Sequence, residues 1–184
     1  MRNYSRYITD FKSTNTLIGI CVVVYVLQML NPRLTGQFGL FAAPLSSQGY
    51  YRIITCAFLH GSPTHLLMNM MSLYNIGTFV EERLGDRKYL GVILVSLLTS
   101  GLAVVYLSPA GTLTVGFSGV IFGIFGAFIA IMIRSGAIHN NAVMSTIMRM
   151  LIPNIIISLM PGVSWQGHLG GMLGGLIAGL LMIR

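Results

Sequence analysis

Charged residues are scarce in this sequence, and acidic residues are nearly absent. Asp, Glu, Lys and Arg make up 8% of the 184 residues, and only 4 residues are acidic. A soluble domain of this length needs a larger polar surface to face water. Hydrophobic residues account for 54% of the chain, and the mean hydropathy is +0.79. The composition therefore excludes a soluble protein and predicts a polytopic membrane protein.

Six apolar stretches approach the ~20 residues that a membrane-spanning helix needs. They are Thr16–Leu30, Leu66–Val80, Tyr89–Leu107, Val115–Ile133, Val143–Met160 and Trp165–Ile183. We therefore expect an all-α bundle of six transmembrane helices in a single domain, residues 1–184. Residues 1–13 form a short cytoplasmic lead-in to this domain.

The basic residues predict how this bundle is oriented. Six spans place both termini on one side of the membrane, and of the 11 Lys and Arg residues only Arg33 and Arg52 fall on the opposite side. The remaining nine are Arg2, Arg6, Lys12, Arg83, Arg87, Lys88, Arg134, Arg149 and Arg184. By the positive-inside rule, both termini are cytoplasmic in a multi-pass protein of the cell membrane. Since the basic residues are scattered and line no single face, the net charge of +7 does not indicate nucleic-acid binding.

Three connections complete the predicted architecture. The long outer segment from Asn31 to Thr64 is too apolar for a free linker, so we expect it to be folded and partly embedded in the membrane interface. The outer loop before Val115 carries no charge and could dip into the bilayer, which would start the fourth helix below the surface. Residues 81–88 are interpreted as a solvated cytoplasmic turn whose charges have no functional role.

The two cysteines are too far apart in this architecture to form a disulfide. Cys21 lies toward the cytoplasmic half of the first span, whereas Cys56 lies in the outer segment. We expect both to be small packing residues.

Three polar residues from distant parts of the sequence fall at a similar depth. The second, fourth and sixth spans all begin on the outer side, and His65, Ser118 and His168 each lie within about one turn of those starts. Ionisable groups inside spans are candidates for function, and a hydroxyl with a base is the minimum requirement for nucleophilic catalysis. The pattern predicts an intramembrane serine hydrolase, with a protease as the favoured class.

Further donors in the same region could stabilise an oxyanion. His65 and Asn69 are four residues apart, so they share a helical face and can donate toward a common point. Ser118 opens its helix, where free N–H groups favour developing negative charge. The backbone amide of Ser118 is therefore a third candidate donor.

The acidic residues limit the chemistry by elimination. Asp10, Glu81, Glu82 and Asp86 are all predicted to be cytoplasmic, about 30 Å of hydrocarbon away from Ser118. A serine hydrolase built here must therefore work as a Ser–His dyad without a carboxylate. The sequence has no His-Glu-x-x-His motif and no acidic residue within a span, which argues against zinc and aspartyl proteases. The outer histidines lack a carboxylate or cysteine at ligand spacing, so we expect neither a metal nor a cofactor.

Glycines recur every four residues in the sixth span, at Gly167, Gly171, Gly175 and Gly179, and again at Gly119 and Gly123 in the fourth. Small residues at this spacing let two helices approach backbone to backbone. We expect the fourth and sixth helices to pack closely, as a hydrogen bond between Ser118 and His168 requires.

Several motifs in order along nearly the whole chain resemble the rhomboid intramembrane serine proteases. The segments concerned are His65-x-x-x-Asn69, Gly116-x-Ser118-Gly119 and Gly167-His168-Leu169-Gly170-Gly171. Tyr51-Arg52, Phe58-Leu59-His60-Gly61 and Glu82-Arg83-Leu84-Gly85 also resemble segments of that family, in which the first of these usually reads Trp-Arg.

The resemblance implies that Ser118 is the nucleophile and His168 the general base and then acid. It implies an oxyanion hole from His65, Asn69 and the Ser118 amide, with Gly116, Gly119 and Phe122 as supporting residues. Phe122 stands where the family often has tyrosine, so it can pack on the imidazole but offers no hydroxyl. The implied partners are membrane lipid and single-span membrane proteins, which enter near the second and fifth spans and are cut at a small side chain by a site open to the outer side.

Two other functions remain open on the sequence. The same fold could bind client membrane proteins without cutting them, although the presence of both Ser118 and His168 argues against this. A transporter could use His65 and His168 as a proton relay, but no inverted repeat or paired broken helices support it. The sequence does not predict an oligomeric state.

Overall fold

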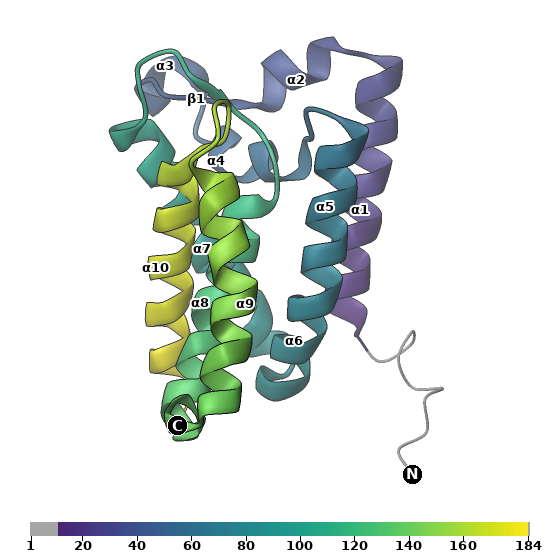
Figure 1. Ribbon diagram of the computed structural model, residues 1–184. Helices are drawn as coiled ribbons and strands as arrows, with labels where there is room; N and C mark the ends of the chain where they lie inside the picture. Colours follow the sequence, from purple (N-terminus) through teal and green to yellow (C-terminus); the bar gives the residue numbers. More distant parts are fainter. Residues whose placement is uncertain (1–10, 184) are drawn as a thin grey trace.

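The computed structural model describes residues 11–183, which form an upright bundle of helices (Figure 1). Arg2, Arg6, Asp10 and Arg184, which entered the predictions above, lie outside the described residues. The long elements are α1 (Lys12–Leu30), α5 (Pro63–Ser72), η3 (Leu73–Gly77), α6 (Thr78–Leu84), α7 (Asp86–Leu107), α8 (Ser118–Arg134), α9 (Asn141–Ser158) and α10 (Trp165–Met182). α5, the π-helical turn η3 and α6 follow one another without a break. A short η4 (Ala137–His139) joins α8 to α9.

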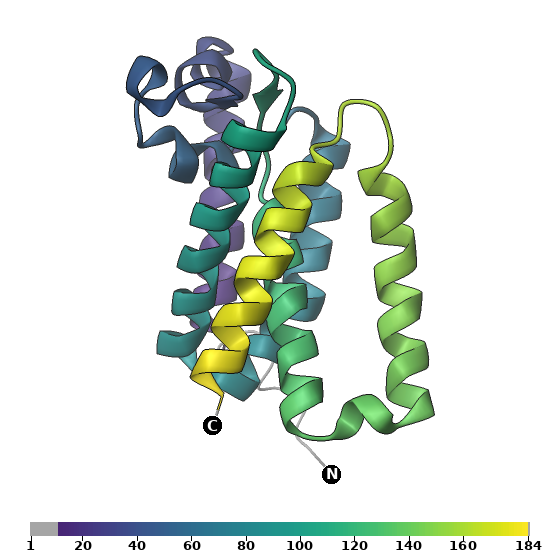
Figure 2. The same cartoon turned by 90° about the vertical axis from the view of Figure 1, so that its left-hand side faces the viewer.

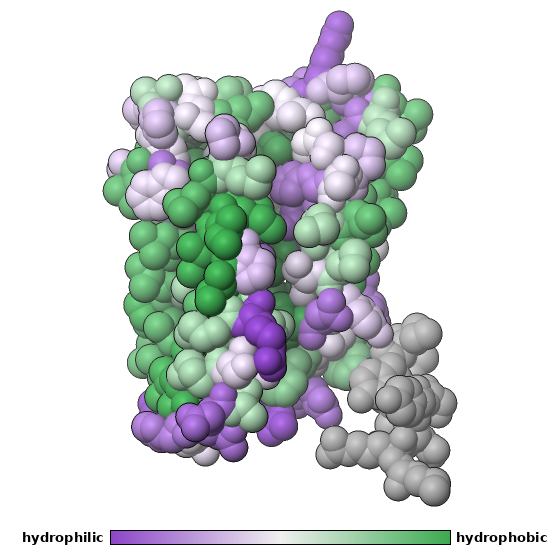
Figure 3. Space-filling view, in the orientation of Figure 1, coloured by the Kyte–Doolittle hydropathy of each residue, from purple (hydrophilic) through white to green (hydrophobic). Residues whose placement is uncertain are grey.

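Three helices within residues 11–183 are long and apolar enough to cross a membrane: α1, α7 and α9. α8 is also apolar but shorter, at 17 residues. Hydrophobic residues cover much of the middle of the molecule, while hydrophilic residues gather toward its two ends (Figure 3). Large apolar side chains such as Leu30 and Leu181 are each 78% exposed, as is usual for groups that face lipid. The chain is thus a helical membrane protein, and three of the six predicted spans meet the length and hydropathy requirements.

The outer segment between α1 and α5 is folded. It contains α2 (Arg33–Phe38), β1 (Leu40–Phe41), α3 (Leu45–Gln48), α4 (Arg52–Thr55) and the 3-10 turn η2 (Cys56–Phe58). The Arg52 guanidinium holds these pieces together, because it donates to the carbonyls of Gln48, Gly36 and Gly39 at 2.7, 2.8 and 2.6 Å. These bonds satisfy carbonyls that the short helices leave free.

A small antiparallel sheet connects this outer segment to the loop before α8. β1 pairs with β2 (Leu113–Thr114), with Leu40 opposite Thr114 and Phe41 opposite Leu113. The all-α prediction did not include these two-residue strands, which are too short to give a sequence pattern. Between β2 and α8, the Gly116 amide donates to the Cys56 carbonyl at 2.9 Å. α8 therefore begins lower than the outer ends of α7 and α10 (Figure 2).

α8 lies at the centre of the bundle and packs directly on α10. Residues 119–128 of α8 are all buried. A methyl group added at Gly171 would overlap the Gly119 carbonyl, and one added at Gly175 would overlap the Gly123 carbonyl. The predicted backbone-to-backbone approach of the fourth and sixth helices is confirmed, and it depends on these glycines.

The interpretation of residues 81–88 as a solvated turn was wrong for Glu81. This carboxylate is 3% exposed and accepts the backbone amides of Ser13 and Thr14, both at 2.9 Å. The first amides of a helix lack partners and carry the positive end of its dipole, so Glu81 caps α1 from another helix. The Thr14 hydroxyl also donates to the Tyr89 hydroxyl at 3.0 Å. Glu81 thus ties the start of α1 to the bundle.

Candidate active site

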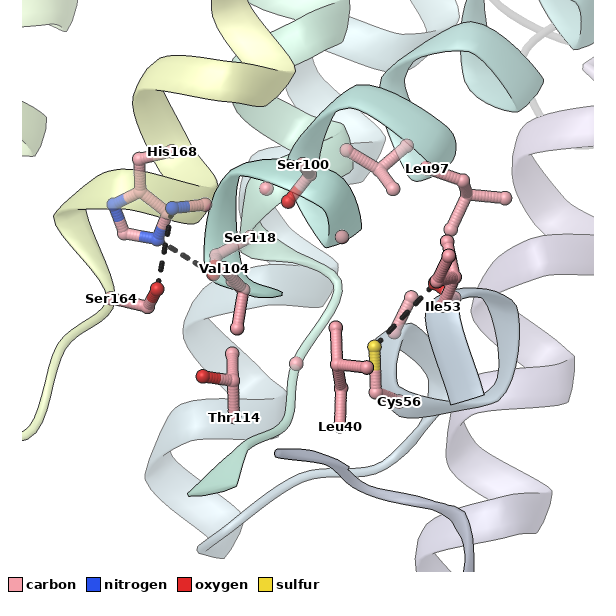
Figure 4. Close-up of a pocket in the computed structure, with 16 residues that line it drawn as sticks. Leu40, Ile53, Cys56, Leu97, Ser100, Val104, Thr114, Ser118, Ser164 and His168 are labelled. Carbon is pink, nitrogen blue, oxygen red and sulfur yellow. Dashed lines mark hydrogen bonds between the residues drawn. The ribbon is translucent and has the colours of Figure 1, made fainter. Parts of the chain in front are cut away.

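Ser118 and His168, predicted as a pair, meet at the N-terminal ends of α8 and α10. Ser118 Oγ lies 2.8 Å from His168 Nε2 (Figure 4). Ser118 is the first residue of α8, so its backbone amide has no acceptor within the helix. His168 lies in the first turn of α10, which Ser164 caps by accepting the Gly167 amide at 3.2 Å. Two helix N-termini therefore converge on this hydrogen bond.

Gly116 allows the chain to turn into α8 at this point. Its φ is +123°, a conformation that L side chains rarely adopt. Phe117, the next residue, is fully buried, and its carbonyl accepts the amides of Val120 and Ile121. A buried aromatic thus anchors the start of the helix on which Ser118 stands.

Packing and hydrogen bonds together hold the imidazole of His168 in place. Phe122 stacks on it, with ring centroids 4.3 Å apart and an interplanar angle of 11°. The side chain is 6% exposed, so it has little freedom to rotate. Phe122 therefore makes the packing contact that the sequence predicted for it.

The second nitrogen of the imidazole has a partner that the sequence analysis missed. His168 Nδ1 lies 2.6 Å from Ser158 Oγ, at the end of α9. Ser158 Oγ also donates to the Asn154 carbonyl at 2.7 Å, within the same helix. The signal available in the sequence was a serine near the outer end of the fifth span, four residues after Asn154 and therefore on the same face. A carboxylate is the usual partner of a catalytic histidine, whereas here the partner is a hydroxyl.

His65 and Asn69 converge on the loop that leads to Ser118. A Cβ added to Gly116 would lie 2.8 Å from His65 Nε2 and 3.6 Å from Asn69 Nδ2, so both nitrogens face the same point of the backbone. Asn69 is buried, and its Nδ2 has no hydrogen-bond partner within residues 11–183. The two residues are positioned by α5, whose N-cap Ser62 accepts the His65 amide at 3.1 Å. The structure thus brings both predicted donors beside the Ser118 loop.

His60 lies next to His65 but faces the interior of the protein. Its ring is 2% exposed and its centroid is 5.2 Å from that of His65. Gln28 fixes the His60 backbone, because its Oε1 accepts the amide at 2.9 Å and its Nε2 donates to the carbonyl at 3.2 Å. Burial, together with the charge of His65, lowers the pKa of His60 to about 4, so the ring is neutral at pH 7.

A small cavity opens beside Ser118, between the outer segment, α7, α8 and α10 (Figure 4). Its polar lining includes Ser100, Thr114 and Ser164, while Leu40, Ile53 and Val104 supply apolar walls. Cys56 also lines it, but burial raises the pKa of this thiol to about 12. Because the thiolate is the reactive form, Cys56 is inert and does not compete with Ser118 as a nucleophile.

The buried carboxylate of Glu81 lies away from this site. Glu81 is bonded to the start of α1, at the opposite end of the bundle from the start of α10 (Figure 1). Within residues 11–183, no three His, Cys, Asp or Glu side chains are grouped so that they could hold a metal ion. The contacts described for the His168 ring, besides Ser118, are a stacked aromatic ring and a second serine.

Comparison with known proteins gives a consistent match over most of the chain. The family described as "Rhomboid domain" matches residues 47–184. "RHOMBOID-like protein 2" of Arabidopsis thaliana is 32% identical over 138 residues, which cover 72% of this chain and 42% of that protein. "Rhomboid protease GluP" of Bacillus subtilis (strain 168) is 27% identical over 167 residues, which cover 87% of this chain and 32% of that protein. The chain thus spans less than half the length of these relatives.

Proposed function

Because this chain belongs to the rhomboid family, we propose that it is an intramembrane serine endopeptidase that cleaves single-span membrane proteins with Ser118 and His168. The observation that carries the proposal is the 2.8 Å hydrogen bond between Ser118 Oγ and His168 Nε2 at the start of a helix. A serine hydroxyl is a weak nucleophile until an adjacent base accepts its proton. The pair supplies that base.

The reaction follows from this hydrogen bond. Ser118 Oγ attacks the scissile carbonyl carbon while its proton passes to His168 Nε2, which gives a tetrahedral oxyanion and an imidazolium. The imidazolium then returns the proton to the leaving amine, and an acyl group remains on Ser118. Water attacks this ester with His168 again as base, which releases the acid product and restores the serine. No acidic side chain is needed in any of these steps.

The oxyanion is assigned to three donors: the Ser118 amide, His65 Nε2 and Asn69 Nδ2. The amide lies at the positive end of α8, where a developing negative charge is favoured. A buried donor without a partner costs about 1–3 kcal/mol, so the unpaired Nδ2 of Asn69 fits a group that gains its acceptor only during the reaction. Gly116 and Gly119 keep the backbone around Ser118 free of side chains.

The proposed topology has six spans in one domain, residues 1–184. Its termini are cytoplasmic, and the site opens toward the outer side, in a multi-pass protein of the cell membrane. The start of α1 and the end of α10 lie at the same end of the bundle, opposite the start of α10, which supports placing both termini on one side of the membrane (Figure 1). The outer segment is proposed to lie partly in the membrane interface, where its exposed Tyr50 and Tyr51 suit the headgroup region.

The test is cleavage in a membrane. The purified protein is reconstituted in liposomes with a labelled single-span substrate that carries small residues near its outer end. We expect cleavage within the outer half of the span, none with Ser118→Ala or His168→Ala, and normal cleavage with Ser145→Ala, a matched change at an exposed serine. Cleavage should also fall toward acid pH, because a protonated imidazole cannot accept the serine proton.

Two results would contradict the protease proposal. Near-normal turnover by Ser118→Ala would remove the proposed nucleophile. Tight binding of the substrate without cleavage, in liposomes and in detergent alike, would instead identify a rhomboid-like protein that binds clients without cutting them.

A further inference from the structure

Ser158 is the one hydrogen-bond partner of His168 Nδ1 within residues 11–183. We propose that Ser158 is a positioning residue that holds His168 in the tautomer with its hydrogen on Nδ1. This inference rests on the proposed function, in which the other nitrogen, Nε2, must accept a proton from Ser118. It assigns to a neutral serine the task that a carboxylate performs in a Ser-His-Asp triad.

The single hydrogen of the Ser158 hydroxyl determines the tautomer of His168. Ser158 Oγ lies 2.7 Å from the Asn154 carbonyl oxygen, which can only accept, so the hydroxyl hydrogen points there. With that hydrogen committed, Ser158 Oγ can only accept at its second contact, 2.6 Å from His168 Nδ1. The imidazole must therefore donate from Nδ1. In a neutral ring this leaves a lone pair on Nε2, directed at Ser118 Oγ 2.8 Å away.

The same arrangement fits the charged stage of the reaction. When Ser118 attacks a carbonyl carbon, its proton moves to Nε2 and the ring becomes an imidazolium with hydrogens on both nitrogens. Nδ1–H then continues to donate to Ser158 Oγ, in a charge-assisted hydrogen bond. Ser158 keeps its own proton throughout, so it orients the ring and takes no part in proton transfer.

A serine bonded to the carbonyl four residues earlier is common in helices and does not by itself indicate a function. Ser96 and Thr146 make such bonds, to the carbonyls of Val92 and Ala142 at 2.7 and 3.0 Å. Ser158 differs because its oxygen makes a second hydrogen-bond contact, with the Nδ1 atom of a buried imidazole. This second bond leaves α9 and reaches α10.

The position of Ser158 also links α9 to the site. Ile147 and Ser158 are the two buried residues of α9, so most of this helix has little contact with the bundle. In Figure 2, α9 stands apart from the other helices along much of its length. Ser158 Oγ, the acceptor, belongs to α9, whereas His168 belongs to α10. The tautomer of His168 therefore depends on the position of the C-terminal end of α9.

Two variants of equal size separate the hydroxyl from the volume it fills. Ser158→Thr keeps the hydroxyl, whereas Ser158→Val has the same shape without it. Loss of a hydrogen-bond partner that fixes the tautomer of a histidine lowers activity by roughly 10- to 100-fold. We expect kcat to fall by this factor in Ser158→Val with KM unchanged, and Ser158→Thr to remain near the wild type. Thr146→Val is the control. It removes an exposed hydroxyl of α9 that donates to a carbonyl of the same helix, and it should leave kcat unchanged. Equal kcat values for Ser158→Thr and Ser158→Val would overturn the inference.

A spectroscopic measurement tests the tautomer directly and needs no cleavage. The nitrogen chemical shifts of a 15N-histidine-labelled protein distinguish protonated from unprotonated ring nitrogens, and the His168 signals are those lost in His168→Asn. We expect Nδ1 protonated and Nε2 unprotonated at neutral pH, with a shift toward the opposite tautomer in Ser158→Val. A wild-type protein with its hydrogen on Nε2 would overturn the inference. If the tautomer is as expected but no serine-dependent cleavage occurs, the positioning role of Ser158 stands and the proposed protease activity fails.

Discussion

Gly171→Ala is expected to disrupt the close contact between α8 and α10. Gly171→Ala would place a methyl group against the Gly119 carbonyl, with no flexible side chain that could move aside. Gly119 follows Ser118 directly, and Gly171 lies three residues after His168, on the same side of α10. The substitution therefore pushes the two helices apart next to the Ser118–His168 hydrogen bond.

The expected effects are large on activity and moderate on stability. Overpacking a tight interface costs about 1–3 kcal/mol. To restore ordinary carbon–oxygen contact, α10 must shift by at least about 1 Å, and a misplacement of about 1 Å already costs about 10²-fold in catalysis. The same shift would lengthen the Ser118–His168 contact from 2.8 Å to beyond hydrogen-bonding distance.

The assay compares Gly171→Ala with Gly19→Ala, since an added methyl at Gly19 has no atom within 4 Å. Stability is measured by titrating the detergent-solubilised protein with SDS, and kcat at a temperature where both variants are folded. We expect Gly19→Ala to match the wild type or to gain up to about 1 kcal/mol, because alanine favours helix. If Gly171→Ala keeps wild-type stability and kcat, the close packing of α8 on α10 does not position the reactive pair.

Two further predictions concern residues of α5 and of the connection before it. Asn69→Ala should lower kcat by about 10²- to 10³-fold with little change in KM, as loss of one oxyanion donor does. Asn75→Ala, at an exposed position, is the control and should leave kcat unchanged. Equal kcat values for the two variants would contradict the role of Asn69. Burial lowers the pKa of His60 to about 4, whereas an unfolded histidine titrates near 6.5, so on acidification the unfolded chain binds a proton first. His60 should therefore lower the free energy of unfolding of the wild type by roughly 3 kcal/mol between pH 6.5 and 4. This contribution should be absent in His60→Leu. An unchanged pH dependence in His60→Leu would show that the ring is not buried as described.

The length of the apolar stretches predicted the positions of the long helices well, because an apolar stretch that crosses a membrane has few alternatives to a helix. The observed α7, Asp86–Leu107, nearly coincides with the stretch Tyr89–Leu107, and α10 with Trp165–Ile183. Some starts differ: α1 begins at Lys12 and not at Thr16, and α8 begins at Ser118 and not at Val115. Gly116 adopts a positive φ, and its amide is bonded to Cys56, so residues 115–117 belong to the loop.

Interactions between distant elements were the part that the sequence could not predict. Glu81 was assigned to water because it follows an apolar stretch among other charges, and its bond to the start of α1 requires knowledge of which helices are neighbours. Ser158 was overlooked for a similar reason. Serine in a span is common and inexpensive, and only the position of α9 beside α10 shows that it reaches His168.

The pair Ser118 and His168 was predictable from a different kind of information. Topology places both residues near the outer start of a span, and the glycine repeat brings those spans together. Topology and glycine spacing require no side-chain detail, so the sequence alone predicts that these two residues, which lie 2.8 Å apart, are neighbours.

The central claim is that Ser118 is a nucleophile activated by His168, and covalent labelling tests it most directly because it needs no substrate. The protein in liposomes is treated with a fluorophosphonate probe, and the modified residue is identified by mass spectrometry. The account predicts a single adduct on Ser118, lost in Ser118→Ala and strongly reduced in His168→Ala. No adduct at Ser118, or equal labelling of Ser118 with and without His168, would contradict it.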